Sequence, residues 1–191
     1  MVESSKYPYL LLAVTTPQAG ESGPELTLSV TDKTVDVFDQ AGRSIQSLPF
    51  GGETPDQDNK DYFAVVEDLN FDGLPDVRIL FSRGNANVYY DCWLWRPEEN
   101  AFARRDDMRE LSNPVFDREA RAIHVYEHGS ATSHVKGTLA WENGDDLVWV
   151  AKTVQDQADD GENIVVRRYL RDSGGELRLV GEETFPPEEF D

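Results

Sequence analysis

The chain has 191 residues, enough for one domain with a sizeable hydrophobic core. Hydrophobic residues make up 39% of it, and the longest apolar run, residues 7–14, is too short to cross a membrane as a helix. Its 37 acidic and 18 basic residues give a net charge of −19, which disfavours nucleic acid and anionic lipid as partners. Such a charge would attract a basic protein, or it would serve solubility alone.

The N-terminal run lacks the pattern of a signal peptide, because Glu3 spoils a basic start and Pro8 interrupts the apolar region. The sequence also has no lipobox cysteine. If the native form is exported or lipid-anchored, the signal is expected to be missing from this sequence.

Most of the chain alternates apolar and polar residues with a period of two, which predicts β-strands rich in β-branched and aromatic side chains. Turn sequences such as DQAG, ENGDD and DSGG separate the strands. The best helix candidate is REARA near Arg118. The predicted strands are 7–14, 25–30, 33–38, 44–50, 62–69, 77–82, 87–95, 122–128, 134–141, 146–154, 163–170 and 176–183. This spacing predicts an all-β sandwich, barrel or propeller.

The segment 67–80, EDLNFDGLPDVRIL, collects oxygen-bearing side chains at alternate positions, as a calcium loop does. Gly73 allows the sharp turn, and strands enter and leave the loop. The helical calcium hand ends on a glutamate at its twelfth position, where this chain has Ile79. The candidate Ca²⁺ ligands are the side chains of Asp68, Asn70, Asp72 and Asp76 and the carbonyl of Leu74. The spacing resembles the calcium loop of FG-GAP propeller repeats, D-x-N-x-D-G-x-x-D.

Residues 156–163 match this calcium-loop pattern more weakly, because Ala158 stands where a ligand is needed. We therefore expect a solvated turn there. The single cysteine, Cys92, excludes an internal disulfide and is expected to be a small buried hydrophobe. On the same predicted strand, Tyr89, Trp93 and Trp95 alternate along one face. They would either pack in the core or stack on sugars.

The segment 126–134, YEHGSATSH, has the residue types of a partner-binding loop at the end of a strand. Its candidate contact residues are Tyr126, Glu127, His128, Gly129, Ser130 and His134. Tyr126 would be either an exposed anchor or a core residue. His124 and His128 share a strand face, and we do not expect them to form a metal pair.

The region 62–149 resembles a family of bacterial proteins in which the calcium loop precedes the strand YDCWLW, the segment MRELSNPVFD, an aromatic-Tyr strand ending in a glycine loop, and the hairpin WENGDDL. Members are propeller-like, calcium-bearing inhibitors of lysozyme-like effectors, and they act as periplasmic immunity proteins that are often lipoproteins. The resemblance implies that a tyrosine-bearing loop enters the substrate cleft of a peptidoglycan hydrolase. Tyr126 is the best match for that tyrosine.

The sequence therefore predicts a small β-propeller-like domain over 1–184, followed by an acidic tail at 185–191. The predicted function is a calcium-stabilised inhibitor of a secreted, basic, lysozyme-like hydrolase. The alternative is a carbohydrate-binding or adhesive calcium-binding module. The chain carries no G-x-S-x-G, H-E-x-x-H, P-loop or dinucleotide motif, and we do not expect an enzyme.

Overall fold

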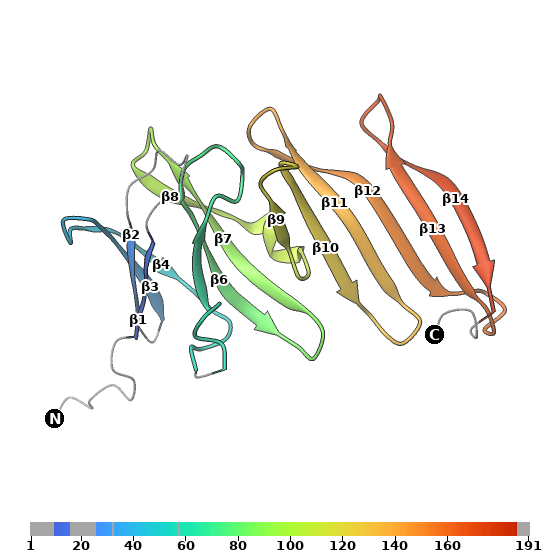
Figure 1. Cartoon of the computed structure of the whole chain (residues 1–191), viewed down its shortest axis with the longest axis horizontal. Coiled ribbons are helices and arrows are strands. Elements are labelled where there is room, and N and C mark those ends of the chain that lie inside the picture. The colour runs from blue at the N-terminus through green and yellow to red at the C-terminus, as the bar shows by residue number, and fades with distance from the viewer. Residues whose placement is uncertain (1–9, 16–25, 32, 57, 187–191) are drawn as a thin grey trace. The chain divides into compact units, whose positions relative to one another are not determined.

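The computed structural model describes residues 10–15, 26–31, 33–56 and 58–186, and it is built almost entirely from antiparallel β-sheet (Figure 1). The strands form three sheets, two of four strands and one of six. The helical structure within those ranges is one short 3₁₀ helix, and no helix found there is long and apolar enough to span a membrane. The all-β prediction is confirmed, while propeller-like closure stays a prediction.

The first sheet is a meander in which each strand pairs with the next one along the chain. Aliphatic side chains fill the inner face of this sheet. They come from every second residue of β2 and from two residues of β3, as strand alternation requires. Leu48 of β4 completes this buried layer. The strands are β1 (Leu10–Thr15), β2 (Leu26–Val30), β3 (Thr34–Asp39) and β4 (Ser44–Pro49).

The second sheet is a meander of the same kind and ends in the 3₁₀ helix. The side-chain amide of Gln46 on β4 bonds both backbone groups of Phe102 on β8, with distances of 3.1 and 2.7 Å, and so joins the first two sheets. The elements are β5 (Ala64–Glu67), β6 (Asp76–Arg83), β7 (Val88–Arg96), β8 (Ala101–Arg105) and η1 (Asp106–Glu110).

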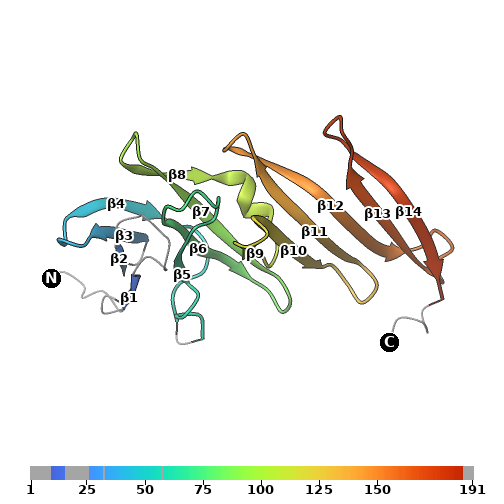
Figure 2. The ribbon, with the colours of Figure 1, turned by 45° about the horizontal axis from the view of Figure 1, so that its top comes forward.

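The third sheet contains six strands in the order β14-β13-β12-β11-β10-β9, which lie side by side in Figure 2. Its strands are β9 (Val115–Asp117), β10 (Ala122–His128), β11 (His134–Glu142), β12 (Asp146–Gln157), β13 (Ile164–Arg171) and β14 (Leu177–Phe185). Gly137 makes room for the indole of Trp149, because a Cβ at that glycine would lie 2.3 Å from a ring carbon. A larger residue at 137 would therefore displace the tryptophan.

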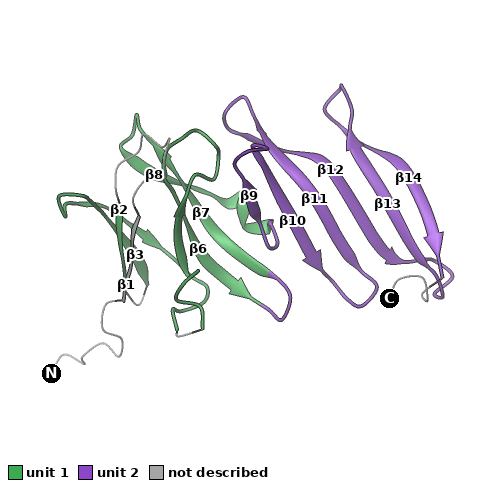
Figure 3. Cartoon of the chain, viewed as in Figure 1, with its two compact units in different colours: residues 1–83, 88–110 green, residues 84–87, 111–191 purple. Residues whose placement is uncertain are grey.

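The chain divides into two compact units, coloured separately in Figure 3. One unit holds residues 1–83 and 88–110, and the other holds 84–87 and 111–191. The β5–β6 loop with the predicted calcium ligands belongs to the first unit, and the β10–β11 hairpin belongs to the second.

Each strand predicted from the sequence is found, although residues 7–9 lie outside the described ranges. Two further strands, β8 and β9, were not predicted. The helix predicted near Arg118 is wrong, because residues 118–121 form a tight turn in which Arg121 has a φ of 50°. Strand β14 continues through Phe185, the first residue of the predicted acidic tail, and residues 187–191 lie outside the described part.

A buried carboxylate holds η1 against the second sheet. The side chain of Asp91 on β7 is 1% exposed and accepts a hydrogen bond of 3.0 Å from Arg104 and one of 2.6 Å from Arg109. The guanidinium of Arg109 also lies 4.2 Å from the centre of the Phe81 ring. Asp91 therefore bonds two cations that the turn from β8 into η1 brings over the sheet.

Replacing Asp91 by Ala should lower the free energy of unfolding by about 2 kcal/mol, because two cations lose a buried partner. The loss stays moderate because both arginine side chains are about one third exposed and can reach water. Asp106→Ala is the matched control, since that carboxylate is 83% exposed and also pairs with Arg104. Urea unfolding should show a loss below about 1 kcal/mol for the control, and equal losses for both variants would contradict this account.

Candidate functional site

The β5–β6 loop turns its acidic side chains toward its own backbone. Asp68 is buried, and its two carboxylate oxygens accept hydrogen bonds from the backbone N–H groups of Asp72 and Gly73, both at 3.0 Å. Asp72 accepts the amide of Asn70 at 2.9 Å and the N–H of Leu74 at 2.8 Å. The loop is thus held in a tight turn by the side chains that the sequence marks as calcium ligands.

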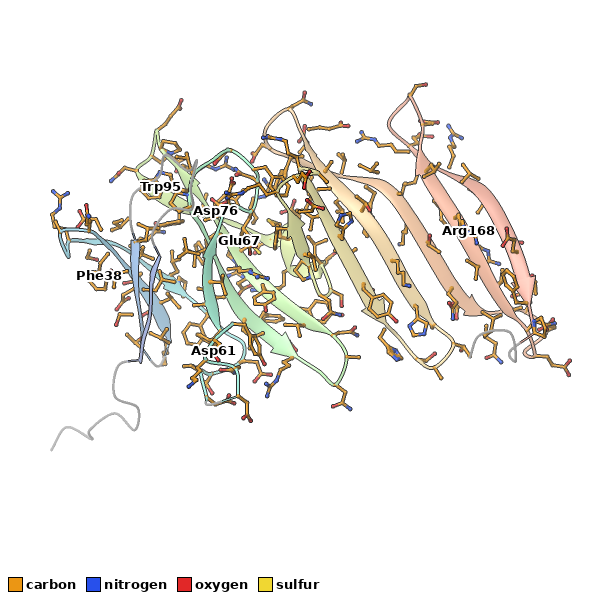
Figure 4. The ribbon with its side chains drawn as sticks, in the orientation of Figure 1. Phe38, Asp61, Glu67, Asp76, Trp95 and Arg168 are labelled. Atoms are coloured by element: carbon orange, nitrogen blue, oxygen red, sulfur yellow. The ribbon has the colours of Figure 1, made fainter. Side chains whose placement is uncertain are left out.

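Asp76 ties this loop to two strands. It is the first residue of β6 and is fully buried, and Figure 4 labels it together with Trp95. One carboxylate oxygen accepts the N–H of Leu69 and the other accepts the N–H of Trp95 on β7, each at 2.8 Å. Burial raises the pKa of Asp76 well above its usual range, the two N–H donors oppose that rise, and the charges of Asp72 and Asp68 add to it.

The loop contains two residues with positive φ, Phe71 at 60° and Gly73 at 86°. Glycine adopts this conformation freely, whereas phenylalanine does so at a cost of about 1 kcal/mol. The ring of Phe71 is buried, and that burial compensates for the unfavourable backbone. The turn between Asn70 and Asp72 is therefore fixed by packing as well as by hydrogen bonds.

The donor chemistry of the loop fits a hard cation, because it offers three carboxylates, an amide oxygen and the backbone carbonyl of Leu74. Each carboxylate oxygen that accepts one N–H keeps a second lone pair. Over the described ranges, however, the structure draws together no group of three or more histidine, cysteine, aspartate or glutamate side chains able to hold a metal ion. Calcium at this loop therefore stays a prediction.

The β10–β11 hairpin gathers aromatic and imidazole side chains on one face. Tyr126 pairs with Lys136, and His128 pairs with His134, so all four side chains share that face. The hydroxyl of Tyr126 lies 3.0 Å from Nδ1 of His134, and the two rings are stacked with centroids 5.7 Å apart. The rings of His128 and His134 meet edge to face at 4.5 Å.

Tyr126 is half-buried in this arrangement, so it is not a core residue of the sheet. The ammonium of Lys136 lies 5.5 Å from the centre of its ring. Glu127 belongs to the opposite face by alternation, and it does not join the cluster. Of the predicted contact residues, the structure brings together Tyr126, His128 and His134.

The tip of the hairpin is a compact turn. The N–H groups of Gly129 and Ser130 donate to the carbonyl of Ser133 at 2.8 and 3.1 Å. The hydroxyl of Ser130 accepts the N–H groups of Thr132 and Ser133. Gly129 and Ser130 are exposed, so the tip is open to solvent beside the aromatic cluster.

Strand β9 pairs with only the first three residues of β10. Beyond them, short polar segments provide hydrogen-bond partners for the outer edge of β10. The carbonyl of Ser112 accepts the N–H of Tyr126 at 3.1 Å, and Asn113 donates to the carbonyl of Tyr126 at 2.7 Å. Asn87 accepts the N–H of His128 and donates to its carbonyl, both at 2.9 Å. These contacts fix the backbone beneath Tyr126 and His128.

Sequence reasoning did not find Asn87 and Asn113 as supports of the hairpin. The only local signals were the turn sequence GNAN before β7 and the Asn-Pro pair at 113–114. Asn113 adopts a φ of 47°, which asparagine tolerates better than most residues, and it also donates to the carbonyl of Ala86 at 2.9 Å.

The remaining candidates are structural. Trp93 and Trp95 are 7% and 8% exposed, so neither presents a ring face to a sugar, and Trp95 packs on Phe102 with centroids 4.9 Å apart. Cys92 is buried as expected, and burial raises the pKa of its thiol. The weaker match at 156–163 is a turn in which Asp160 accepts the N–H groups of Glu162 and Asn163.

No protein-family model matches the chain, and no curated protein matches it. Among solved structures, the chain is similar to one described as "Structure of a Xanthomonas Type IV Secretion System related protein". The two share 16% sequence identity over 84% of each chain, with a TM-score of 0.59. An identity this low establishes a shared fold and nothing beyond the fold.

Replacing Asn87 by Ala should speed amide hydrogen exchange at His128 and lower the free energy of unfolding by about 1–2 kcal/mol, because two hydrogen bonds to the edge of β10 are lost. Asn85→Ala is the matched control, since this exposed asparagine lies in the same turn. Exchange measured by NMR should be unchanged in the control. Unaltered exchange at His128 in Asn87→Ala would contradict the proposed edge support.

Proposed function

We propose that this protein is a calcium-stabilised inhibitor of a secreted lysozyme-like peptidoglycan hydrolase, acting as an immunity protein in the periplasm. The single observation that carries the proposal is the β10–β11 hairpin, where Tyr126, His128 and His134 form one cluster beside an exposed tip. Edge contacts from Asn87 and Asn113 hold the cluster's backbone. A rigid aromatic residue beside an open turn is the kind of element that fills a concave partner site.

The chemistry of the cluster suits a cleft lined with carboxylates. The phenol and the two imidazoles can donate hydrogen bonds, and the ammonium of Lys136 adds a positive charge. Lysozyme-like hydrolases act through a pair of acidic residues on either side of the scissile bond. Contacts between these donors and those acids would place the hairpin where the substrate binds.

The charge of the whole chain supports a basic partner. A net charge of −19 raises the encounter rate with a positively charged protein, while the contacts of the hairpin set how long the complex lasts. The secretion-related description of the similar Xanthomonas structure also agrees with a protein that meets secreted effectors. The propeller-like closure of the sheets belongs to the same proposal.

The carbohydrate-binding alternative loses the residues on which it was based. Its candidate stacking surface was the aromatic face of β7, and Trp93 and Trp95 on that face are buried. Tyr89 alone is half-buried there. The hairpin cluster therefore carries the proposed function.

In the proposed function, calcium is a structural ion and takes no part in chemistry. It would be held by Asp68, Asn70, Asp72, Asp76 and the carbonyl of Leu74. The ion would offset the repulsion among three carboxylates, one of them fully buried at Asp76. Because Asp76 also accepts the N–H of Trp95, an ordered loop would strengthen the junction between β6 and β7.

Saturating calcium should raise the melting temperature, and a hundredfold excess over the dissociation constant corresponds to about 2.7 kcal/mol of stability. Asp72→Ala should abolish the response, and magnesium should substitute poorly because it prefers a tighter octahedral shell. Asp160→Ala, in the other acidic turn, is the matched control and should respond as the wild type does. A melting temperature that is identical in calcium and in chelator would contradict the proposed calcium site.

Replacing Tyr126 by Ala should weaken inhibition of the partner hydrolase about thirtyfold or more, while the protein stays folded. The loss is expected because the truncation removes an aromatic anchor with a hydrogen bond to His134. Tyr169→Ala is the matched control, since Tyr169 is a half-buried tyrosine on the opposite face of the same sheet. The measurements are a thermal melt and an inhibition titration against a lysozyme-like hydrolase recovered by pull-down.

Tyr126→Phe separates the ring from its hydroxyl, and we expect a smaller loss of potency because the ring remains and only the bond to His134 is lost. A folded Tyr126→Ala variant that inhibits at wild-type potency would overturn the role of this residue.

A further inference from the structure

The outer edge of β14 is an unpaired sheet edge in the part of the chain that the structure describes. This strand is the last in the six-stranded sheet, and no other strand that the structure describes pairs with its outer side. Exposed edges in soluble proteins are usually protected by charged side chains, above all lysine, by proline, by β-bulges or by very short strands. β14 has nine residues, LRLVGEETF, and contains neither lysine nor proline.

The centre of this edge is apolar. The backbone register slips between Arg168 and Tyr169 on β13, so that Val180 on β14 has no partner residue and forms a bulge. Val180 is 57% exposed, its neighbour Leu179 is 51% exposed, and Leu170 on β13 is 51% exposed. Leu179 and Val180 therefore expose two large aliphatic side chains at the centre of the edge strand, and Leu170 exposes a third on the face of the sheet opposite to Leu179.

The charges on β14 are separated along the strand. Arg178 precedes the apolar centre, and Glu182 and Glu183 follow it. Arg178 pairs with Leu170 and Glu183 pairs with Val166, and these two β13 residues are four apart, so Arg178 and Glu183 point to the same face. An antiparallel copy of this strand would place the arginine of each copy opposite a glutamate of the other.

We propose that β14 pairs antiparallel with β14 of a second copy of this chain, giving a two-fold symmetric dimer whose six-stranded sheets join. In this pairing Arg178 faces Glu183 of the partner subunit, Leu179 faces the partner's Glu182, and Val180 faces the partner's Gly181. A two-fold contact uses the same surface on both copies, so each favourable pair occurs twice. A parallel pairing would instead set glutamates against glutamates and is disfavoured.

The ion pairs within one chain do not oppose this arrangement. Arg178 lies 2.8 Å from Asp172 and 2.7 Å from Glu176, and Glu183 lies 3.0 Å from Arg168. All of these side chains are at least one third exposed, and such pairs contribute little to stability. The bulge at Val180 raises the local twist, so the paired stretch is expected to be short and centred on residues 180–181.

Sedimentation equilibrium of the full chain at physiological ionic strength tests this inference, which does not depend on the proposed inhibitory function. The expected result is a monomer–dimer equilibrium. Val180→Lys should raise the dissociation constant of the dimer at least about tenfold, because it places a charge in the apolar centre of the paired edge. Val115→Lys is the matched control, because Val115 is an equally exposed valine, at 61%, on the opposite edge strand β9.

A charge exchange tests the register. Arg178→Glu alone should weaken the dimer, since it sets like charges against each other twice. The double variant Arg178→Glu with Glu183→Arg should restore it, because the exchanged charges match again. A circular-dichroism melt of each variant verifies that the fold is retained.

A chain that stays monomeric at all concentrations would overturn the proposal, as would an open series of larger species. A dimer that survives Val180→Lys, or one that the double variant does not restore, would also overturn it.

Discussion

The hairpin depends on one constraint: the backbone N–H and C=O groups along the unpaired edge of β10 need hydrogen-bond partners. Buried or half-buried backbone groups must find hydrogen-bond partners, and β9 provides them only as far as His124. Ser112, Asn113 and Asn87 take over for the rest of the strand. Side chains and loop carbonyls thus do the work of a missing neighbouring strand, and they fix the backbone that carries Tyr126 and His128.

In the β5–β6 loop, backbone hydrogen bonds offset the repulsion among closely spaced carboxylates. Three carboxylates within nine residues repel one another, and one of them, Asp76, is fully buried. The structure offsets that repulsion with backbone N–H donors, which Asp68, Asp72 and Asp76 all accept. Neutral donors stabilise a carboxylate less than a cation would, and this difference is the physical basis for proposing calcium at the loop.

Alternation of apolar and polar residues was enough to predict most of the strands, and in β2 every second residue is buried, as the pattern implies. It failed at β8, where AFARR carries a single large apolar residue, and at β9, which has only three residues. REARA has helical propensity but forms a turn, because the side chain of Asp117 accepts the N–H of Ala120 and Arg121 takes a positive φ. Local propensity was overridden there by a side chain just outside the segment.

In the candidate sites, too, features that are local in the sequence could be predicted, and contacts between distant residues could not. Tyr126, His128 and His134 could be singled out because they are close in sequence, and alternation along β10 places Glu127 on the other face. The supports of the cluster could not be predicted, since Asn87 and His128 are 41 residues apart. Likewise, the loop pattern marked Asp76 as a ligand, but one of its hydrogen bonds comes from the backbone N–H of Trp95, which is 19 residues further along the chain.

The central claim is that the hairpin is the surface that meets the hydrolase. Amide hydrogen exchange of this chain, measured with and without a secreted lysozyme-like hydrolase that binds it, tests that claim most directly. The account predicts that binding slows exchange at the tip residues 129–133 and at the adjoining ends of β10 and β11. Slowed exchange elsewhere in the chain, with the hairpin unchanged, would contradict it.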